Sequence, residues 1–306
     1  MALLIRFFCE YLRSIAFYSV LLLNTMNILT FDIEDWFHIL GHPINNDLGR
    51  WKAQPSNLEK NLDKILEILL KHKQKATFFS LGWIAEQYPG SIRSISEAGF
   101  EIGSHTYSHR RIREFTPEVF REDVERSMQT VEDVLGKKVK SFRFPGFQVN
   151  NRYLWALEIL AELGLEFDSS VQISHMNTRI PQKSYPVYLE VNGHRLKEFP
   201  IPVRYLANQV IYRSGSGFFR LYPYESTQRF LQKNSYNLVY FHPRDFDIQM
   251  MDKSHFNPLR NFKIRAGLSG ALVKFERLLE EFEFMDIQTA NKLVDWDESR
   301  VFRHSW

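Results

Sequence analysis

Two histidines four residues apart, His105 and His109 in SHTYSH, have the type and spacing of a metal-binding pair. Neutral imidazoles at this spacing can bind zinc and leave further coordination positions open for water and substrate. A second pair, His38 and His42, has the same spacing, so spacing alone does not choose between them. Context favours His105 and His109, because they follow a predicted strand that ends at Gly103 and Ser104, and the turn after it places both imidazoles on one side. We expect at most one of the two pairs to be a metal site.

Three carboxylates lie within four residues of the segment TFDIEDWFH: Asp32, Glu34 and Asp35. An isolated acidic cluster is usually solvated or caps a turn. A two-histidine site, however, needs an oxygen ligand, and a hydrolase needs a second carboxylate that accepts a proton from the attacking water. On a strand, Asp32 and Glu34 point to the same face, and Asp35 joins them only if the chain has already turned. The sequence leaves open which of Glu34 and Asp35 is the ligand.

Three further polar residues follow predicted strands: Arg143, Asp168 and His242. Arg143 is either a surface residue or the partner that keeps a catalytic carboxylate ionised and oriented. Asp168, in FDSS, is also an ordinary turn former. His242 is either a hydrogen-bonded core histidine or a general acid that protonates a leaving amine. Because active-site residues of parallel barrels gather at the carboxyl ends of the strands, we expect all three beside the histidine pair.

The elements that must position these residues alternate between short strands and helices from residue 27 onward, which is typical of βαβ units and of a parallel sheet or barrel. The predicted strands span residues 27–31, 76–80, 100–104, 139–144, 165–168 and 237–241. Helical spacing marks a segment after the N-cap Ser56, then 83–98 with a break near Pro89, 116–135, 154–163 and 268–284. Frequent Pro, Gly and Tyr between residues 171 and 225 predict turns and short strands.

Composition excludes several classes of protein. The chain has 306 residues and 39 Lys and Arg against 36 Asp and Glu, with no concentrated basic face, so we expect no nucleic-acid partner. A hydrophobic content of 44% predicts a folded protein with a large core. The single cysteine, Cys9, excludes an internal disulfide and a cysteine-based zinc site. Any metal ligands must therefore be histidines and carboxylates.

Residues 1–25 allow two interpretations. The apolar run from Ile15 to Leu23 has the length of a signal-peptide core and is short for a membrane span, but no small-x-small cleavage site follows it. Alternatively Met26 is the true start, because MNILTFDIEDW opens directly into a strand. Membrane association is expected only if residues 1–25 are retained.

In order along the chain, these motifs resemble those of the metal-dependent polysaccharide deacetylases of carbohydrate esterase family four. TFDIED resembles the first motif, usually Thr-Phe-Asp-Asp-Gly, which supplies the base and a metal ligand. HTYSH resembles the second motif, and RFP the third, whose arginine supports the base. Asp168 resembles the fourth, which orients the acid, and Phe241-His242 the fifth. The resemblance spans residues 26–247, although the first motif lacks its Asp-Asp-Gly and the fourth lacks its downstream Asp-Trp.

More narrowly, TFDIEDWFH, FRFPGF, FDSS, EFPIPV, SGSGFFRLYPY and YFHPRDFD together resemble the exosortase-associated subgroup found with bacterial exopolysaccharide loci. The resemblance implies an α/β fold: a distorted (β/α)7 barrel over residues 26–250, with a helical extension over 251–306 packed on it. It implies a divalent cation, expected to be Zn²⁺, on His105, His109 and Glu34 or Asp35. It also implies Asp32 as base, Arg143 and Asp168 as supports, His242 as acid, and Trp36, Tyr107 and Pro145 at the substrate.

The function so implied is removal of N-acetyl groups from amino sugars of a bacterial exopolysaccharide, with an N-acetylated oligosaccharide or polysaccharide as partner. Two alternatives stay open. One is a metal-independent amide or ureide hydrolase of the same fold. The other is a glycan-binding protein without catalysis, which would stack sugars on Trp36, Trp83 and Tyr107. For the location, the cytoplasm and the periplasm or inner membrane stay as alternatives.

Overall fold

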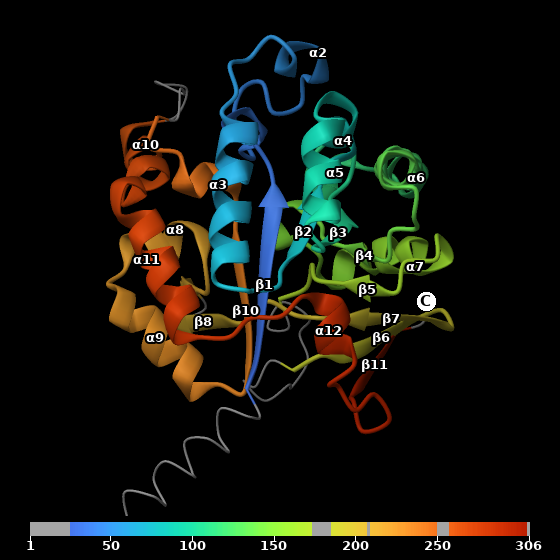
Figure 1. Ribbon diagram of the computed structural model, residues 1–306. Coiled ribbons are helices and arrows are strands. Elements are labelled where there is room, and N and C mark those ends of the chain that lie inside the picture. Colours follow the sequence, from blue (N-terminus) through green and yellow to red (C-terminus); the bar gives the residue numbers. More distant parts are fainter. Residues whose placement is uncertain (1–24, 173–184, 207–208, 250–256, 305–306) are drawn as a thin grey trace, which may run out of the picture.

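The computed structural model describes residues 25–172, 185–206, 209–249 and 257–304 (Figure 1). The apolar run at 15–23 and most of the extension at 1–25 lie outside the described residues. Within the described part of the chain, no helix combines the length and the apolar composition needed to cross a membrane.

One mostly parallel sheet organises the molecule. Its strand order is β10-β1-β2-β3-β4-β5-β7-β6-β11, and the seven strands from β10 to β7 are all parallel to their neighbours. The α/β prediction is confirmed, and the parallel run has the seven strands expected of the barrel. β10 and β7 are the two outer strands of this parallel run. A hydrogen bond connects them, because the hydroxyl of Tyr236, at the start of β10, donates to the Pro200 carbonyl (2.9 Å), two residues after β7.

The strands have the following bounds: β1 Met26–Ile33, β2 Thr77–Ser80, β3 Glu101–Ser104, β4 Ser141–Phe142, β5 Phe167–Asp168, β6 Val187–Val191, β7 His194–Glu198, β8 Val203–Leu206, β9 Gln209–Arg213, β10 Tyr236–Phe241 and β11 Val301–His304. β6 runs antiparallel to β7, β11 runs parallel to β6, and β8 and β9 form a separate hairpin.

The helices lie around the outside of the sheet (Figure 1): α2 Leu48–Trp51, α3 Leu58–Lys71, α4 Gly82–Gln87, α5 Pro89–Glu97, α6 Pro117–Leu135, α7 Leu154–Glu162, α8 Ser216–Leu221, α9 Tyr224–Lys233, α10 Pro258–Arg265, α11 Leu268–Glu281 and α12 Ile287–Asn291. Short 3-10 turns follow several strands: η1 Trp36–His38, η2 Ile112–Glu114, η3 Pro145–Phe147, η4 Asn151–Tyr153 and η6 Pro243–Phe246. The segment expected to be a helical extension also contains β11, which joins the sheet beside β6.

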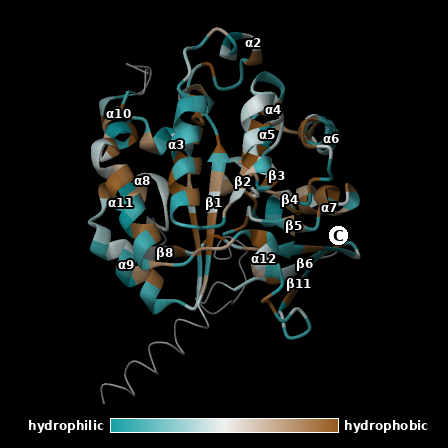
Figure 2. Ribbon diagram, viewed as in Figure 1, coloured by the Kyte–Doolittle hydropathy of each residue, from teal (hydrophilic) through white to brown (hydrophobic). Residues whose placement is uncertain are grey.

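Alternate residues of β1 belong to two different hydrophobic clusters, as the two-residue period of a strand requires. Leu29, Phe31 and Ile33 belong to the larger cluster, which includes the inner faces of the helices. Phe31 meets Phe275 of α11 edge to face, with ring centroids 6.0 Å apart, so α11 is the packing helix that its spacing predicted. Ile28 belongs to the smaller cluster. Figure 2 shows hydrophobic and hydrophilic residues alternating around the outer helices.

Local signals placed most element ends correctly. The 83–98 segment divides into α4 and α5 at Pro89, which occupies the first turn of α5. Thr116 caps α6 by accepting the Val119 N–H, and Gly136 ends that helix in the left-handed conformation at φ 66°.

Two local predictions need correction. The N-cap of α3 is Asn57 and not Ser56, whose hydroxyl accepts the Leu58 N–H (3.1 Å) while donating to Asp35. The strand expected over 139–144 is only Ser141–Phe142, because the chain turns into η3 at Pro145.

Candidate active site

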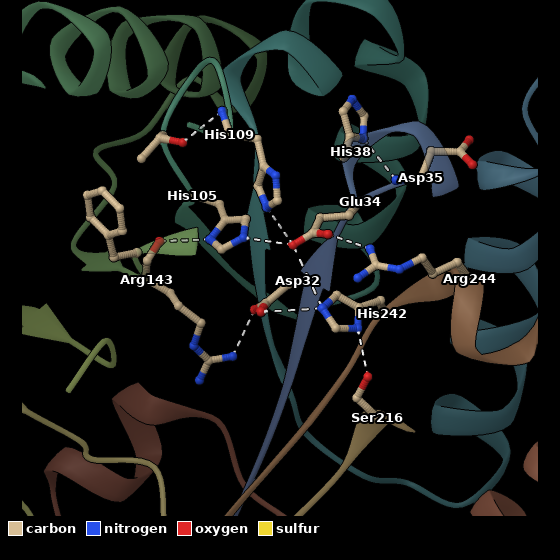
Figure 3. A network of polar contacts seen from close by, with 12 residues as sticks. Asp32, Glu34, Asp35, His38, His105, His109, Arg143, Ser216, His242 and Arg244 are labelled. Carbon is tan, nitrogen blue, oxygen red and sulfur yellow. Dashed lines mark hydrogen bonds and ion pairs between the residues drawn. The ribbon is translucent and has the colours of Figure 1, made fainter. Parts of the chain in front are cut away.

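Glu34 lies between two imidazoles just beyond the end of β1 (Figure 3). Its Oε1 is 3.1 Å from Nε2 of His105 and 2.8 Å from Nε2 of His109. All three side chains are buried, and their ligand atoms lie within 4.8 Å of one another. This group has the composition and closeness of a three-ligand site for a metal ion.

The loop after β3 holds the two histidines in place. Thr106 and His109 adopt positive φ angles of 68° and 49°, which are uncommon for residues other than glycine. Asp123 of α6 anchors the loop by accepting the Tyr107 N–H (2.7 Å) and the Ser108 hydroxyl. The fixed loop therefore turns both imidazoles towards Glu34.

The hydrogen bonding of His105 suits a metal ligand. Its Nδ1 is 2.7 Å from the Arg143 carbonyl oxygen, which can only accept, so Nδ1 carries the proton. In the neutral ring, Nε2 then directs a lone pair at the Glu34 carboxylate, which is also an acceptor. A cation between the two atoms satisfies both, and an imidazole held by a backbone carbonyl is the usual support of a metal-binding histidine.

Electrostatics favour the ionisation states that a cation requires. Burial by itself raises the pKa of Glu34, but Arg244 and the neighbouring imidazoles hold that pKa well below its ordinary value. Burial lowers the pKa of His109, although Glu34 opposes this effect. A carboxylate and a neutral imidazole are the forms that bind metal ions.

Asp35, the other candidate ligand, points away from the imidazoles (Figure 3). Its carboxylate accepts the Trp36 N–H (2.6 Å) and the Ser56 hydroxyl, and so caps η1. Burial raises the pKa of Asp35 to about 6, against the effect of the Ser56 hydrogen bond. Of the two acidic candidates, the structure brings Glu34 to the histidine pair.

The rival pair, His38 and His42, is built into the protein interior. The Nδ1 of His38 accepts the Asp35 N–H (2.9 Å), and its ring packs against Trp51 with centroids 4.3 Å apart. The Nδ1 of His42 accepts the Ile44 N–H (3.3 Å). Neither histidine belongs to a group that could hold a metal among the described residues.

Arg143 is completely buried and holds Asp32 (Figure 3). Its Nη1 donates to Asp32 Oδ1 (2.8 Å) and to the Thr30 hydroxyl (2.7 Å), while Nε and Nη2 donate to the Ser169 carbonyl and hydroxyl. The guanidinium lies over the Phe79 ring at 4.3 Å. The other oxygen of Asp32 is 3.9 Å from Nε2 of His242. Polar side chains from the ends of β1, β4 and β10 therefore lie side by side.

Asp168 and His242 are not in contact. The Asp168 carboxylate accepts the Ser170 hydroxyl (2.5 Å) and the Ser170 N–H (3.2 Å). Burial raises the pKa of Asp168, against the effect of its hydrogen bonds with Glu198 and Ser170. The Nδ1 of His242 is instead 3.0 Å from Oδ2 of Asp245, three residues further along the chain. The expected orienting contact from Asp168 is therefore corrected, because a nearer carboxylate occupies that position.

Trp36, Tyr107 and Pro145 do not present open faces to a sugar. Trp36 is 6% exposed, and its indole N–H donates to the Pro55 carbonyl (2.9 Å). Tyr107 is 4% exposed, and the Arg126 guanidinium covers its ring at 3.7 Å. Pro145 is buried at the start of η3. The structure therefore gives no support to sugar stacking on these residues, nor on Trp83, which is 5% exposed.

Sequence reasoning missed several polar residues around this cluster. Arg244 forms an ion pair with Oε2 of Glu34, and the Asn45 amide nitrogen is 3.4 Å from Nδ1 of His109. Arg220 and Ser216 contact Asp245. The available signal was the HPRD sequence, in which a carboxylate three residues after a histidine can reach back to it across one turn.

Two family models divide the chain between them. Residues 28–167 match the polysaccharide deacetylase family, and residues 169–292 match a domain of unknown function, DUF3473. Residues 28–167, a little under half of the chain, are thus similar to polysaccharide deacetylases. Within the polysaccharide deacetylase match lie Asp32, Glu34, His105, His109 and Arg143, whereas His242 and Asp245 lie in the DUF3473 match.

Individual proteins give the same picture over shorter stretches. The chain is 35% identical to a peptidoglycan-N-acetylglucosamine deacetylase of Bacillus cereus over 31% of this chain and 35% of that protein. It is 32% identical to a chitooligosaccharide deacetylase of Azorhizobium caulinodans over 26% of this chain and 39% of that protein. The chain thus spans little more than a third of the length of these relatives.

The fold is also found among solved structures. A crystal structure from Mycobacterium smegmatis, described as that of a polysaccharide deacetylase, superimposes with a TM-score of 0.62 at 18% identity, covering 89% of this chain and 90% of that chain. At this identity the match supports the fold alone.

Proposed function

We propose that this protein is a polysaccharide deacetylase, a metal-dependent hydrolase that removes N-acetyl groups from amino sugars of a bacterial polysaccharide. The observation that carries the proposal is the buried group of Glu34, His105 and His109, with Asp32 and His242 beside it. Nε2 of His242 is 3.7 Å from Oε1 of Glu34 and 3.9 Å from Oδ2 of Asp32. A candidate proton acceptor, Asp32, and a candidate proton donor, His242, therefore lie beside the candidate metal ligand Glu34.

The residues suit hydrolysis of an amide. Glu34, His105 and His109 would hold a divalent cation, which when bound would supply Lewis acidity to the acetyl carbonyl and to water. Asp32 accepts a proton from the attacking water as the new C–O bond forms. His242 donates a proton to the nitrogen as the C–N bond breaks. The products are acetate and a free amino sugar, so atoms and protons balance.

Arg143 has a positioning role in this scheme. It occupies Oδ1 of Asp32 through a 2.8 Å hydrogen bond and leaves Oδ2 on the side of His242. The guanidinium is itself held by Ser169 and by stacking over Phe79. Such a support keeps the proton acceptor in one orientation while substrate binds.

We further propose Zn²⁺ as the cation and an exopolysaccharide as the substrate. Two histidines and a carboxylate with open positions are a common zinc set in hydrolases. The exopolysaccharide assignment rests on the six sequence segments that resemble the exosortase-associated subgroup.

The test combines metal analysis with acetate release from N-acetylglucosamine oligomers. Purified protein is expected to hold about one Zn²⁺ per chain and to release acetate, and chelation is expected to abolish release until zinc is restored. His105→Ala should lose both metal and activity, whereas His42→Ala, from the rival pair, should keep both. Equal acetate release by the wild type and His105→Ala, or full activity without metal, would contradict the proposal.

A further inference from the structure

The polysaccharide deacetylase match ends at residue 167, but His242 lies in the DUF3473 match. We propose that Asp245 and Arg220 form a positioning pair, which fixes the ring orientation and tautomer of His242 for protonation of the leaving amine. This inference rests on the function proposed above. The domain of unknown function thereby supplies the acid half of the site, and its carboxylate takes the role expected of Asp168.

Asp245 contacts His242 at both a backbone and a side-chain nitrogen. Oδ2 of Asp245 accepts the backbone N–H of His242 (2.9 Å) and lies 3.0 Å from its Nδ1. Because a carboxylate only accepts, Nδ1 carries a proton and Nε2 is left as the atom that gives and regains one. Nε2 is the atom that faces Asp32 and Glu34.

Arg220 in turn holds the Asp245 carboxylate in place. Nε of Arg220, in α8, donates to Oδ1 of Asp245 (3.1 Å), and both residues are buried. Nη1 of Arg220 donates to the carbonyls of Ile264 (2.9 Å) and Ala266 (2.7 Å), just before α11. Arg220 therefore links α8, η6 and the α10–α11 connection, all within the DUF3473 match.

The start of α8 packs tightly against β10. Gly215 has φ 135° and forms an isolated bridge with Tyr240 of β10. A Cβ atom at Gly215 would lie 1.9 Å from the Tyr240 carbonyl oxygen, so only glycine fits there. The next residue, Ser216, has its hydroxyl 3.2 Å from both Nδ1 of His242 and Oδ1 of Asp245. α8 is thus joined directly to the strand that ends at His242.

A carboxylate behind an imidazole does two things that matter for an acid. It selects the tautomer and it stabilises the imidazolium from which the proton is donated. Burial alone would raise the pKa of Asp245, but its hydrogen bond to His242 and the charges of His242, Arg220 and Arg244 hold that pKa below its ordinary value. The carboxylate is therefore ionised and available to pair with the ring.

The kinetic test compares two leaving groups. The phenolate of an activated aryl acetate departs without protonation. The amine of an N-acetylated oligomer must be protonated before it departs. Asp245→Asn is expected to lower turnover of N-acetylglucosamine oligomers about 100-fold or more, the range for loss of general acid catalysis, while aryl acetate turnover changes only a few-fold. Bound zinc is expected to stay at the wild-type level. Arg220→Met should show the same selectivity to a smaller degree.

The matched control is Asp247→Asn, two residues further along the same loop. Asp247 is buried and accepts from the Asn57 amide (3.1 Å), with no contact to His242, so both turnover rates should stay near those of the wild type. If Asp245→Asn keeps its zinc and loses turnover equally on both substrates, the positioning role is overturned and the proposed function is not. Selective amide loss in Asp168→Asn and not in Asp245→Asn would also overturn the positioning role. No acetate release by the wild type would overturn the proposed function and, with it, the inference.

A second measurement does not depend on the variants folding. In the wild type, the ¹⁵N chemical shifts of His242 in the neutral ring are expected to show the proton on Nδ1. A ring with its proton on Nε2 and Nδ1 as acceptor would contradict the pairing with Asp245.

Discussion

Arg143 is the residue on which the orientation of Asp32 depends. It is wholly buried, and its charge is met by one carboxylate, two hydroxyls, a carbonyl and the face of Phe79. Removing one member of a buried ion pair leaves the other charge uncompensated, and this costs more than the pair contributes.

We therefore predict that Arg143→Met lowers the free energy of unfolding by about 3–5 kcal/mol. Combining it with Asp32→Asn should cost less than the sum of the two single changes, because Asp32 is then no longer an unpaired charge. Urea denaturation measures all three variants. Lys140→Met is the control, since Lys140 pairs with Glu166 at the surface and its loss should cost less than about 1 kcal/mol. Strict additivity would contradict the buried pairing.

The sequence predicted which residue types lie together in the candidate site, but it did not predict the hydrogen-bond partner of every one of them. The histidine pair and Asp32 could be chosen because each follows a predicted strand. Glu34 and Asp35 could not be separated, since the outcome depends on where β1 ends and on whether Ser56 draws Asp35 away. Asp245 was missed because a short-range partner within a turn is not visible from strand positions alone.

At the scale of elements, Glu101 joins several strands at the amino end of the sheet. Its two carboxylate oxygens accept the hydroxyls of Thr77 on β2 (2.6 Å) and Ser141 on β4, and it also accepts the Gln288 N–H (3.2 Å) of α12. Burial raises the pKa of Glu101, against the effect of these hydrogen bonds.

The sign of the resulting pH dependence follows from linkage. A folded-state pKa above the unfolded value means that the folded protein binds the proton more tightly, so Glu101 stabilises the fold below its ordinary pKa of 4.5. That contribution is lost as pH rises through the raised pKa. Relative to Glu101→Gln, which does not titrate, the wild type should lose free energy of unfolding as pH rises above 4.5 and through the raised pKa of Glu101. Urea denaturation at several pH values measures the difference, and parallel curves would contradict it.

The elements themselves were predictable where local signals were strong. Pro89, Thr116 and Gly136 marked helix ends, because proline, N-cap and left-handed glycine signals act within one turn. β4 was overestimated, since Arg143 and the buried Phe144 belong to the turn that leads into η3. The edge strand β11 was missed, because its pairing with β6 is a long-range contact that short-range patterns do not contain.

At the scale of the whole molecule, the two matched segments build one site. β10, from the DUF3473 match, pairs in parallel with β1 from the polysaccharide deacetylase match along six residue pairs. This register places His242, just past β10, beside Asp32 and Glu34 at the end of β1. The parallel sheet was predictable from alternating strands and helices, but this pairing of distant strands followed only from the family resemblance.

The central claim is that one divalent cation lies between Glu34, His105 and His109, with Asp32 beside it. Anomalous diffraction at the zinc edge, from crystals of the zinc-loaded protein, tests this most directly. The account predicts one strong peak about 2.0–2.2 Å from Nε2 of His105, Nε2 of His109 and a carboxylate oxygen of Glu34. A peak beside His38 and His42, or at the surface group of Glu158, Glu162 and His194, with none at Glu34, would contradict it.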